Sequence, residues 1–192
     1  MSPTAEPACE AGMVRRVSVV GNSGSGKTTV AAQLGARLGV SHIELDAIRH
    51  QPNWQELPDD EFRSRVAALT DADGWVVDGN YGAVRDLVWS RADTVVWLDL
   101  PRLVVARRIV ARSLGRVMGR RELWNGNRET WRNLVTRDPN ESAIRASWQN
   151  HDRNRARYEA AMHDSTNAHL TFVRLTSTRA AKIWSRRGDS NP

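Results

Sequence analysis

A short stretch near the N-terminus constrains the fold of this chain more than any other feature. Residues 21–28 read GNSGSGKT, which matches the phosphate-loop pattern G-x-x-x-x-G-K-[ST] between an apolar run and a helical pattern. Glycines let backbone N–H groups surround phosphate oxygens, the lysine reaches the β- and γ-phosphates, and the hydroxyl completes a Mg²⁺ shell. We predict nucleoside triphosphate binding, a catalytic role for Lys27 and metal binding by Thr28. The predicted nucleotide ligands are Gly21, Asn22, Ser23, Gly24, Ser25, Gly26, Lys27, Thr28 and Thr29.

The length of 192 residues, 40% of them apolar, suits one domain with a full core. We expect a single domain over 14–185 with a lid-like insert at about 113–140, and disordered tails at 1–13 and 186–192. No run approaches the ~20 apolar residues of a membrane span, and the N-terminus lacks signal-peptide features, so we expect a cytoplasmic protein. The single cysteine, Cys9, excludes a disulfide within the chain and a cysteine-built zinc site.

Apolar β-rich runs alternate with helical patterns along the chain, which predicts an α/β fold. We expect a three-layer P-loop NTPase fold with a five-stranded, doubly wound parallel sheet flanked by helices. The predicted strands are 16–20, 42–45, 75–77, 94–98 and 170–175. The predicted helices are 29–38, one that starts at Pro58, 103–116, 141–162 and 180–184.

The net charge of +6 comes almost entirely from arginine, because Lys27 and Lys182 are the only lysines. Between 101 and 121 there is no carboxylate, and the arginines are 102, 107, 108, 112, 116, 120 and 121. Arg108, Arg112 and Arg116 are four apart and share a helix face, where like charges repel. We predict a cationic lid over the triphosphate in which Arg108 and Arg112 act in catalysis. A solvated basic face, or contacts to acidic residues at 122, 129 and 138, is the alternative.

Two aspartates end predicted parallel strands, where ligands bind in such sheets. Asp78 opens a DGNY segment and is the preferred Mg²⁺ ligand, although Asp-Gly is also a common turn starter. Asp99 competes for this role, but the Leu100-Pro101 that follows it suggests that it ends the strand structurally.

Asp46 and Arg49 lie at the end of the second predicted strand. A carboxylate there could orient an acceptor hydroxyl and serve as a general base, and the arginine could bind an acceptor anion. A helix-capping aspartate beside a surface arginine is an equal alternative.

The order of these motifs resembles the adenylate-kinase-like P-loop kinases over roughly residues 15 to 185. That family has Asp-x-x-Arg at the second strand, Asp-Gly at the third, Asp-x-Pro after the fourth and Arg-x-x-x-Arg at the start of the lid. The matching segments are 46–49, 78–79, 99–101 and 108–112. A small bacterial group named adenylate-kinase-like or DNA topology modulation proteins is more similar still, through segments 21–29, 45–46, 77–81, 97–101 and 122–129.

The resemblance implies an acceptor site that includes Asp46, Arg49, Asn80, Tyr81 and Arg85. Adenylate kinases carry an acceptor-binding arginine where this chain has Gly82, and Arg85 is the nearest substitute. The segment between 46 and 78 is also short, and both differences argue against AMP as the acceptor. The stretch 113–140, with tryptophans at 124 and 131 and an asparagine at 125, has no close counterpart in the better-known kinases.

Three hypotheses follow. The leading one is a kinase that transfers the γ-phosphoryl group of ATP·Mg²⁺ to a small acceptor, a nucleotide or another metabolite. The second is an ATP-dependent regulatory protein that binds nucleic acid through its basic surface, although no dedicated nucleic-acid module is recognisable. The third is a plain NTPase. The sequence leaves the acceptor and the oligomeric state open.

Overall fold

A five-stranded, all-parallel sheet lies at the centre of the computed structural model, which describes residues 14–118, 125 and 143–187. Its strands are β1 (Arg16–Gly21), β2 (Ser41–Glu44), β3 (Trp75–Asp78), β4 (Thr94–Leu98) and β5 (Thr171–Leu175). They lie in the order β2-β3-β1-β4-β5, and every neighbouring pair is parallel. The predicted fold class is confirmed.

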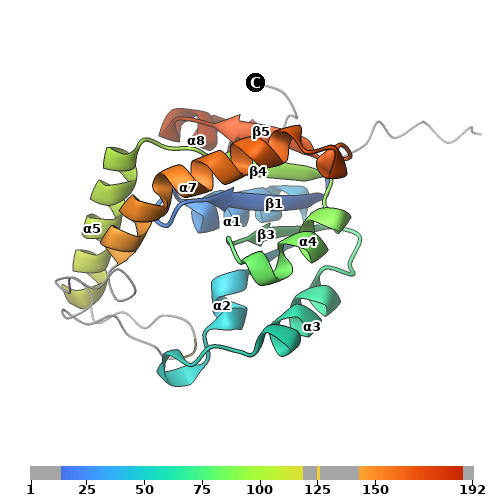
Figure 1. The fold of residues 1–192 in the computed structure, drawn as a ribbon, viewed down its shortest axis with the longest axis horizontal. Helices are drawn as coiled ribbons and strands as arrows, with labels where there is room; N and C mark the ends of the chain where they lie inside the picture. The colour runs from blue at the N-terminus through green and yellow to red at the C-terminus, as the bar shows by residue number, and fades with distance from the viewer. Residues whose placement is uncertain (1–13, 119–124, 126–142, 188–192) are drawn as a thin grey trace, which may run out of the picture.

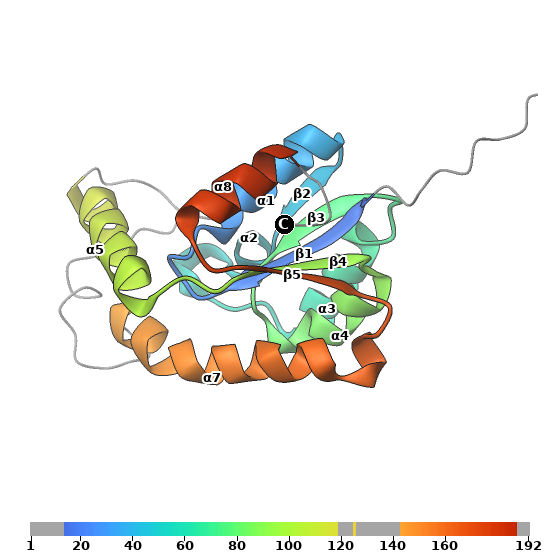
Figure 2. The same cartoon turned by 90° about the horizontal axis from the view of Figure 1, so that it is seen from above.

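Helices cover both faces of this sheet (Figures 1 and 2). Helices α1 (Lys27–Leu38) and α8 (Thr178–Arg187) lie on one face, and α3 (Asp59–Leu69), α4 (Gly82–Arg91) and α7 (Ala143–His163) lie on the other. Helix α5 (Arg102–Met118) stands beyond the carboxyl ends of the strands, and the short α2 (Leu45–Arg49) follows β2. Two 3₁₀ turns, η1 (Pro52–Trp54) and η3 (Ser165–Asn167), complete the described elements.

The side chains of β1 explain why this strand is central. Val17 and Val19 point into a buried cluster formed with α1 and α8, whereas Val20 belongs to a second cluster formed with α3, α4 and α7. A strand buried on both faces reads as a nearly continuous apolar run, as residues 17–20 do with Ser18 as the one polar residue. The phosphate-loop motif therefore begins at the carboxyl end of the central strand.

The predicted strands and helices agree with the structure apart from small boundary shifts, but the structure adds the unpredicted helices α2 and α4. Residue 45 was expected in a strand, yet it begins α2, because a short apolar run cannot distinguish the end of a buried strand from the start of a buried helix. Helix α4 was not predicted, and α8 continues through Arg187, two residues into the expected C-terminal tail. Cys9 with the segment 1–13, and most of the insert at 113–140, lie outside the described residues.

None of the helices in the described ranges has both the length and the hydropathy that a membrane span requires. The longest of them, α7, has 21 residues but carries charged side chains along its length.

Candidate active site

The loop between β1 and α1 forms a tight turn whose backbone only glycine adopts readily. Gly24 and Gly26 have φ angles of 79° and 97°. The N–H of Ser25 donates to the carbonyl of Asn22 at 3.0 Å, and the Lys27 ammonium donates to the same oxygen at 3.2 Å. The loop runs directly into the N-terminus of α1, where free N–H groups and the helix dipole favour an anion.

Helix α5 packs directly against this loop. A Cβ atom on Gly24 would lie 2.5 Å from Cγ1 of Ile109, so a side chain there would force α5 or the loop to shift. Arg108 donates to the carbonyl of Ser25 and to the hydroxyl of Thr178, both at 2.9 Å. Arg112 donates to the Ser23 hydroxyl at 3.3 Å. The structure therefore brings two predicted lid arginines to the loop, while the side chain of the third, at 116, lies outside the described part.

The loop, these arginines and two carboxylates line one cavity of about 350 Å³. Its lining residues are Ser23, Gly24, Gly26, Lys27, Thr28, Thr29, Glu44, Asp46, Arg108 and Arg112. Burial lowers the pKa of the Lys27 ammonium, and the carboxylates of Asp46 and Asp78 oppose this shift. An anion in the cavity would meet cations on the loop side and carboxylates on the β2 side.

Asp78 and Thr28 are the residues expected to hold Mg²⁺. Asp78 ends β3 beside Val19, is buried, and has its Oδ2 atom 3.1 Å from Nε2 of His42. Thr28 is exposed and lines the cavity. Among the described residues no group of three or more histidines, cysteines or carboxylates could hold a metal ion. This donor set fits Mg²⁺ because that ion typically takes one or two protein oxygens and completes its shell with phosphates and water.

Asp99, the competing metal candidate, forms ion pairs within the fold. Its Oδ2 atom accepts two hydrogen bonds from Arg174, at 2.9 and 2.5 Å, and lies 3.6 Å from Nε of Arg155. These contacts join the end of β4 to β5 and α7. They support the structural role that the following Leu100-Pro101 suggested.

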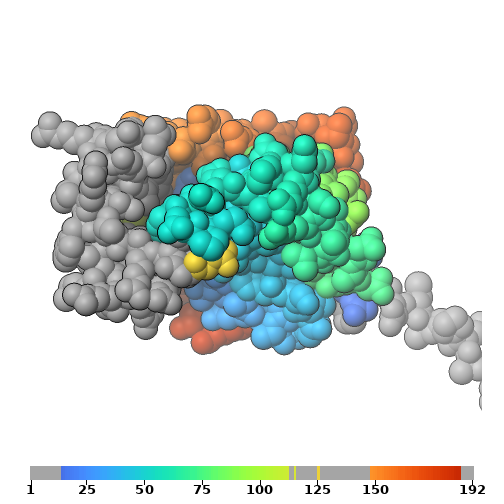
Figure 3. Space-filling view, turned by 90° about the horizontal axis from the view of Figure 1, so that it is seen from below, coloured from blue at the N-terminus to red at the C-terminus, as the bar shows by residue number. Residues whose placement is uncertain are grey.

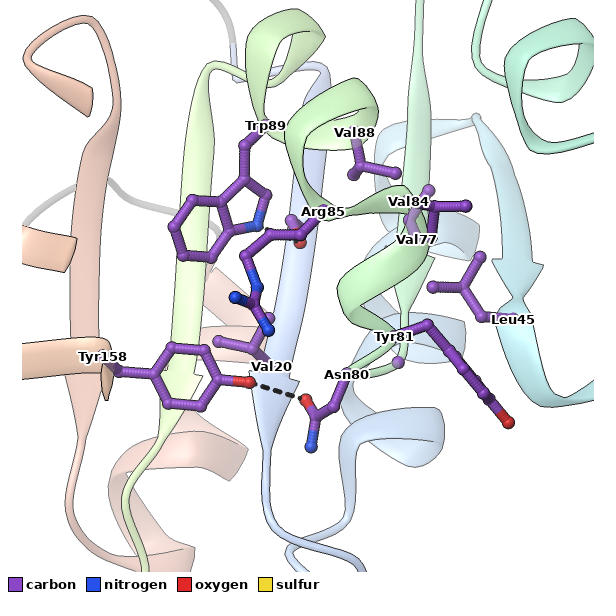
Figure 4. A pocket seen from close by; sticks show the side chains of 12 residues that line it. Val20, Leu45, Val77, Asn80, Tyr81, Val84, Arg85, Val88, Trp89 and Tyr158 are labelled. Carbon is purple, nitrogen blue, oxygen red and sulfur yellow. Dashed lines mark hydrogen bonds between the residues drawn. The ribbon is translucent and has the colours of Figure 1, made fainter. Parts of the chain in front are cut away.

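Asn80 contacts the start of the phosphate loop. Its Oδ1 atom accepts a hydrogen bond from the Tyr158 hydroxyl at 2.9 Å (Figure 4) and another from the Gly21 N–H at 3.2 Å. Its Nδ2 atom donates to the Gly21 carbonyl. The sequence suggested an acceptor ligand here. In the structure this amide is instead hydrogen-bonded to the loop backbone and to Tyr158 of α7.

Helix α7 supplies contacts that the sequence analysis missed. Asn154 donates to the Asn22 side chain at 2.7 Å, and His151 contacts the carbonyl of Leu100 at 3.0 Å. His151, Asn154, Arg155 and Tyr158 follow the i, i+3, i+4, i+7 spacing of one helix face. This spacing of polar residues was a usable signal, although it does not say what the face contacts.

Asp46 lies in a hydrogen-bonded group with Tyr81 and His50. The Tyr81 hydroxyl donates to Asp46 Oδ1 at 2.7 Å and lies 3.3 Å from His50 Nε2. Burial, followed by the negative charge of Asp46, raises the pKa of Tyr81 far above its ordinary range. Tyr81 therefore remains a protonated donor to the carboxylate. The sequence analysis identified Asp46 and Tyr81 but not His50.

Arg49 and Arg85, both predicted to bind the acceptor, have different surroundings. Arg49 donates to Asp59 at 2.6 Å and to Glu56 at 2.8 Å, so it joins α2 to the start of α3. In Arg85 the Nη2 atom is buried without a hydrogen-bond partner in the described part of the chain, and the guanidinium carbon lies 5.8 Å from the Trp89 ring centre. Its side chain extends toward the Asn80–Tyr158 pair, beside a cavity of about 10 Å³ (Figure 4).

Comparisons with known proteins identify the fold. A scan against protein-family models finds no match, and a search of curated proteins finds none either. Among solved structures, a shikimate kinase from Acinetobacter baumannii in complex with shikimate is 17% identical, with a TM-score of 0.53 over 91% of this chain and 90% of that one. A shikimate kinase from Bacteroides thetaiotaomicron is 14% identical, with a TM-score of 0.51 over 91% and 96%. A gluconokinase from Sinorhizobium meliloti 1021 is 18% identical, with a TM-score of 0.49 over 91% and 93%. The two shikimate kinase matches, with TM-scores above 0.5, show that the chain has the fold of these P-loop kinases.

Proposed function

We propose that this protein is a kinase that transfers the γ-phosphoryl group of ATP to a small acceptor. The observation that carries the proposal is the single cavity lined by the phosphate loop, Arg108, Arg112 and Asp46. Such a cavity holds a polyphosphate on one side and offers a carboxylate to an acceptor on the other. We expect the enzyme to work in the cytoplasm, where ATP is made.

Residues in and near the cavity have different roles in phosphoryl transfer. Backbone N–H groups of the loop and the Lys27 ammonium bind phosphate oxygens, and Arg108 and Arg112 balance charge on the transferring group. Thr28 and Asp78 would hold Mg²⁺, which neutralises charge on the phosphates when it is bound. Asp46 orients the acceptor. Most of the catalysis in this reaction is positioning and charge stabilisation, which the cavity is built to supply.

The acceptor lies, in this proposal, on the side of the cavity formed by α2 and the segment after β3. Asp46, which accepts a hydrogen bond from Tyr81, contacts it there, and Arg85 is available for an anionic substituent because its Nη2 atom has no hydrogen-bond partner among the residues that the structure describes. Arg49 contributes by fixing the position of α2 through its ion pairs with Glu56 and Asp59.

The test is transfer of labelled γ-phosphate from ATP·Mg²⁺ to a panel of nucleoside monophosphates, nucleosides and small hydroxylated metabolites. Lys27→Ala should abolish transfer, and Lys182→Ala, at the only other lysine, should not. Transfer to one acceptor establishes the kinase. Release of inorganic phosphate alone would identify a plain NTPase. ATP binding with no turnover would contradict the proposal and favour the regulatory hypothesis, which salt-dependent DNA binding would then test.

A further inference from the structure

We propose that the nucleophile of the acceptor is the hydroxyl group of a small alcohol, and that Tyr81 and His50 position the Asp46 carboxylate to receive its proton. This inference rests on the proposed kinase function and names the class of substrate. Asp46 is the catalytic residue, and the other two are positioning residues.

The two carboxylate oxygens of Asp46 differ in their hydrogen bonds. Oδ1 accepts from Tyr81 at 2.7 Å, whereas Oδ2 accepts no hydrogen bond from the residues that the structure describes. Because Tyr81 gives its only hydroxyl proton to Asp46, its 3.3 Å contact with His50 requires a proton on Nε2 of the imidazole. The direction of donation is thus from His50 to Tyr81 to Asp46. One oxygen of a residue that lines the ATP cavity stays available for a hydroxyl.

Packed rings fix both positioning residues. The Phe62 ring meets Tyr81 edge to face, with centres 5.2 Å apart at 71°, and the Trp54 ring meets His50 at 5.6 Å and 74°. Edge-to-face pairs of this kind stabilise the rings beyond the effect of their buried area. The rings therefore hold the imidazole and the phenol in the orientation that the hydrogen bonds need.

The turn that carries Trp54 is strained. Asn53 and Trp54 have φ angles of 60° and 58°, in the left-handed region that residues other than glycine rarely adopt. The Gln51 N–H holds the turn by donating to the Gln55 carbonyl at 2.7 Å, and a β-bridge joins His50 to Glu56. This segment lies on the face formed by α2, η1 and α3 (Figure 3). Strain that is held in this way is typical of functional sites.

The charges around Asp46 favour a hydroxyl over a phosphate monoester as nucleophile. A monoester carries about −1.5 to −2 charge near pH 7 and would need unpaired cations. The carboxylates of Glu44 and Asp78 act on the same Lys27 ammonium as Asp46 does, so this side of the site is acidic. Arg49 is already paired with Glu56 and Asp59, and Arg85 lines a different cavity from the one that Asp46 lines. A neutral O–H group can instead donate to Asp46 Oδ2.

The step balances with the residues present and ATP as co-substrate. The acceptor oxygen forms a bond to the γ-phosphorus, and the bond from that phosphorus to the β–γ bridging oxygen breaks. ADP leaves with the electron pair. The hydroxyl proton passes to Oδ2 of Asp46 and is later released to solvent.

One experiment tests the hydrogen-bonded group without any acceptor. The chain has two tyrosines, so Tyr158→Phe leaves Tyr81 as its only phenol. Ultraviolet absorbance then reports the ionisation of Tyr81 alone. In that background Tyr81 should resist ionisation at the pH of about 10 at which an ordinary tyrosine titrates. Adding Asp46→Asn should shift its titration to lower pH, because a negative charge and a carboxylate acceptor are both removed. Identical titration curves would overturn the positioning role.

A second experiment tests the substrate class. In the acceptor panel, transfer should occur to an alcohol, and Tyr81→Phe should lower kcat about 10- to 100-fold with little change in KM for ATP. His50→Gln, which keeps a side-chain N–H donor, should retain more activity than His50→Leu. Transfer only to phosphate monoesters would overturn this inference while leaving the kinase intact. Absence of transfer to every acceptor would instead count against the proposed function, and the tyrosine titration would still decide the role of Tyr81.

Discussion

Asn80 binds both polar groups of the Gly21 backbone, although the two residues are 59 positions apart in the sequence. The amide accepts from the Gly21 N–H and donates to the Gly21 carbonyl, as a neighbouring strand would. Tyr158 of α7 donates to the same Asn80 oxygen. The segment after β3 and helix α7 therefore both fix the point at which β1 becomes the phosphate loop.

Asn80→Ala should lower the free energy of unfolding by about 2–4 kcal/mol, because it leaves the buried N–H and carbonyl of Gly21 without partners. Nucleotide affinity should fall as well, since the loop loses its fixed starting point. Tyr158→Phe removes only one hydrogen bond to Asn80 and should cost about 1 kcal/mol. Urea denaturation and titration with a fluorescent ATP analogue measure both effects. Equal losses in the two variants would show that the Asn80–Gly21 contact has no special weight.

Alanine substitutions at Gly24 and Gly39 test the contact between α5 and the phosphate loop, with Gly39 as the matched control. Both have positive φ angles, 79° and 67°, so alanine is strained at either site by about 1 kcal/mol. Only at Gly24 would the new Cβ also meet Ile109, at 2.5 Å, whereas nothing lies within 4 Å at Gly39. Gly24→Ala should therefore destabilise the protein by about 1–3 kcal/mol more than Gly39→Ala does, and should weaken ATP binding. Thermal unfolding with and without ATP·Mg²⁺ measures the difference, which would vanish if α5 did not pack on the loop.

Lys27→Met should stabilise the nucleotide-free protein and weaken ATP binding about 10- to 100-fold, because a hydrogen bond to a charged group contributes roughly 1.5–3 kcal/mol. Burial lowers the pKa of Lys27 from its ordinary 10.5, so the folded protein holds this proton less tightly than the unfolded chain. The resulting destabilisation is fully present below the folded pKa and disappears as pH rises toward 10.5. The melting temperature of Lys27→Met should therefore exceed that of the native protein at pH 7, with a gap that narrows at alkaline pH.

Lys182→Met is the control, because Lys182 is the other lysine of the chain and is exposed on α8. It should change neither the melting temperature nor ATP affinity. A Lys27→Met protein less stable than the native one at pH 7 would mean that the carboxylates near Lys27 outweigh its burial.

The sequence predicted the layered fold well because its signals are local. The glycine pattern of residues 21–26 and the apolar runs of β1 and β4 each lie within a few consecutive residues, and the structure keeps them. Helix α4 was not predicted because Asp78-Gly79 and Gly82 are turn signals, and only Val84, Val88 and Trp89 are buried on it. Local sequence patterns therefore do not predict a short helix that begins next to glycines.

The side-chain partners in the site could not be predicted in this way. The position of Asp46 at a strand end predicted its role, and the resemblance implied the roles of Asn80 and Tyr81, but the partners of all three are set by contacts across the fold. Tyr158 reaches Asn80 from 78 positions away, and Tyr81 reaches Asp46 from 35. These side-chain pairs depend on the order of the strands in the sheet. A single sequence does not reveal that order.

Arg112→Ala should lower kcat about 10²- to 10³-fold and change KM for ATP only a few-fold, because an arginine that stabilises the transferring phosphoryl group acts mainly in the transition state. Arg107→Ala, also on α5, is the control, because Arg107 is exposed and does not line the cavity. Steady-state kinetics with the acceptor found in the panel measure both variants. Similar losses in the two would indicate a general effect of charge on α5, and a large rise in KM alone would make Arg112 a ground-state ligand.

Comparing Arg85 with Arg91, both on helix α4, distinguishes a role in ligand binding from a role in stabilising the fold. The Nη2 atom of Arg85 is buried and has no hydrogen-bond partner within the described ranges, whereas Arg91 donates to the Ala67 carbonyl at 2.7 Å and to the Thr70 hydroxyl at 2.9 Å. An unsatisfied buried donor costs roughly 1–3 kcal/mol, against about 0.5–1 kcal/mol gained from a cation over an aromatic ring.

Arg85→Met should therefore leave the free energy of unfolding unchanged or raise it by up to about 1 kcal/mol, while Arg91→Met should lower it by about 1–2 kcal/mol. If Arg85 binds an anionic substituent of the acceptor, Arg85→Met should also raise KM for a hydroxy acid about 10-fold or more and leave KM for the corresponding uncharged alcohol unchanged. Urea denaturation and kinetics with such a pair of acceptors measure the two effects separately. Loss of stability in Arg85→Met, with equal effects on both acceptors, would make Arg85 a structural residue.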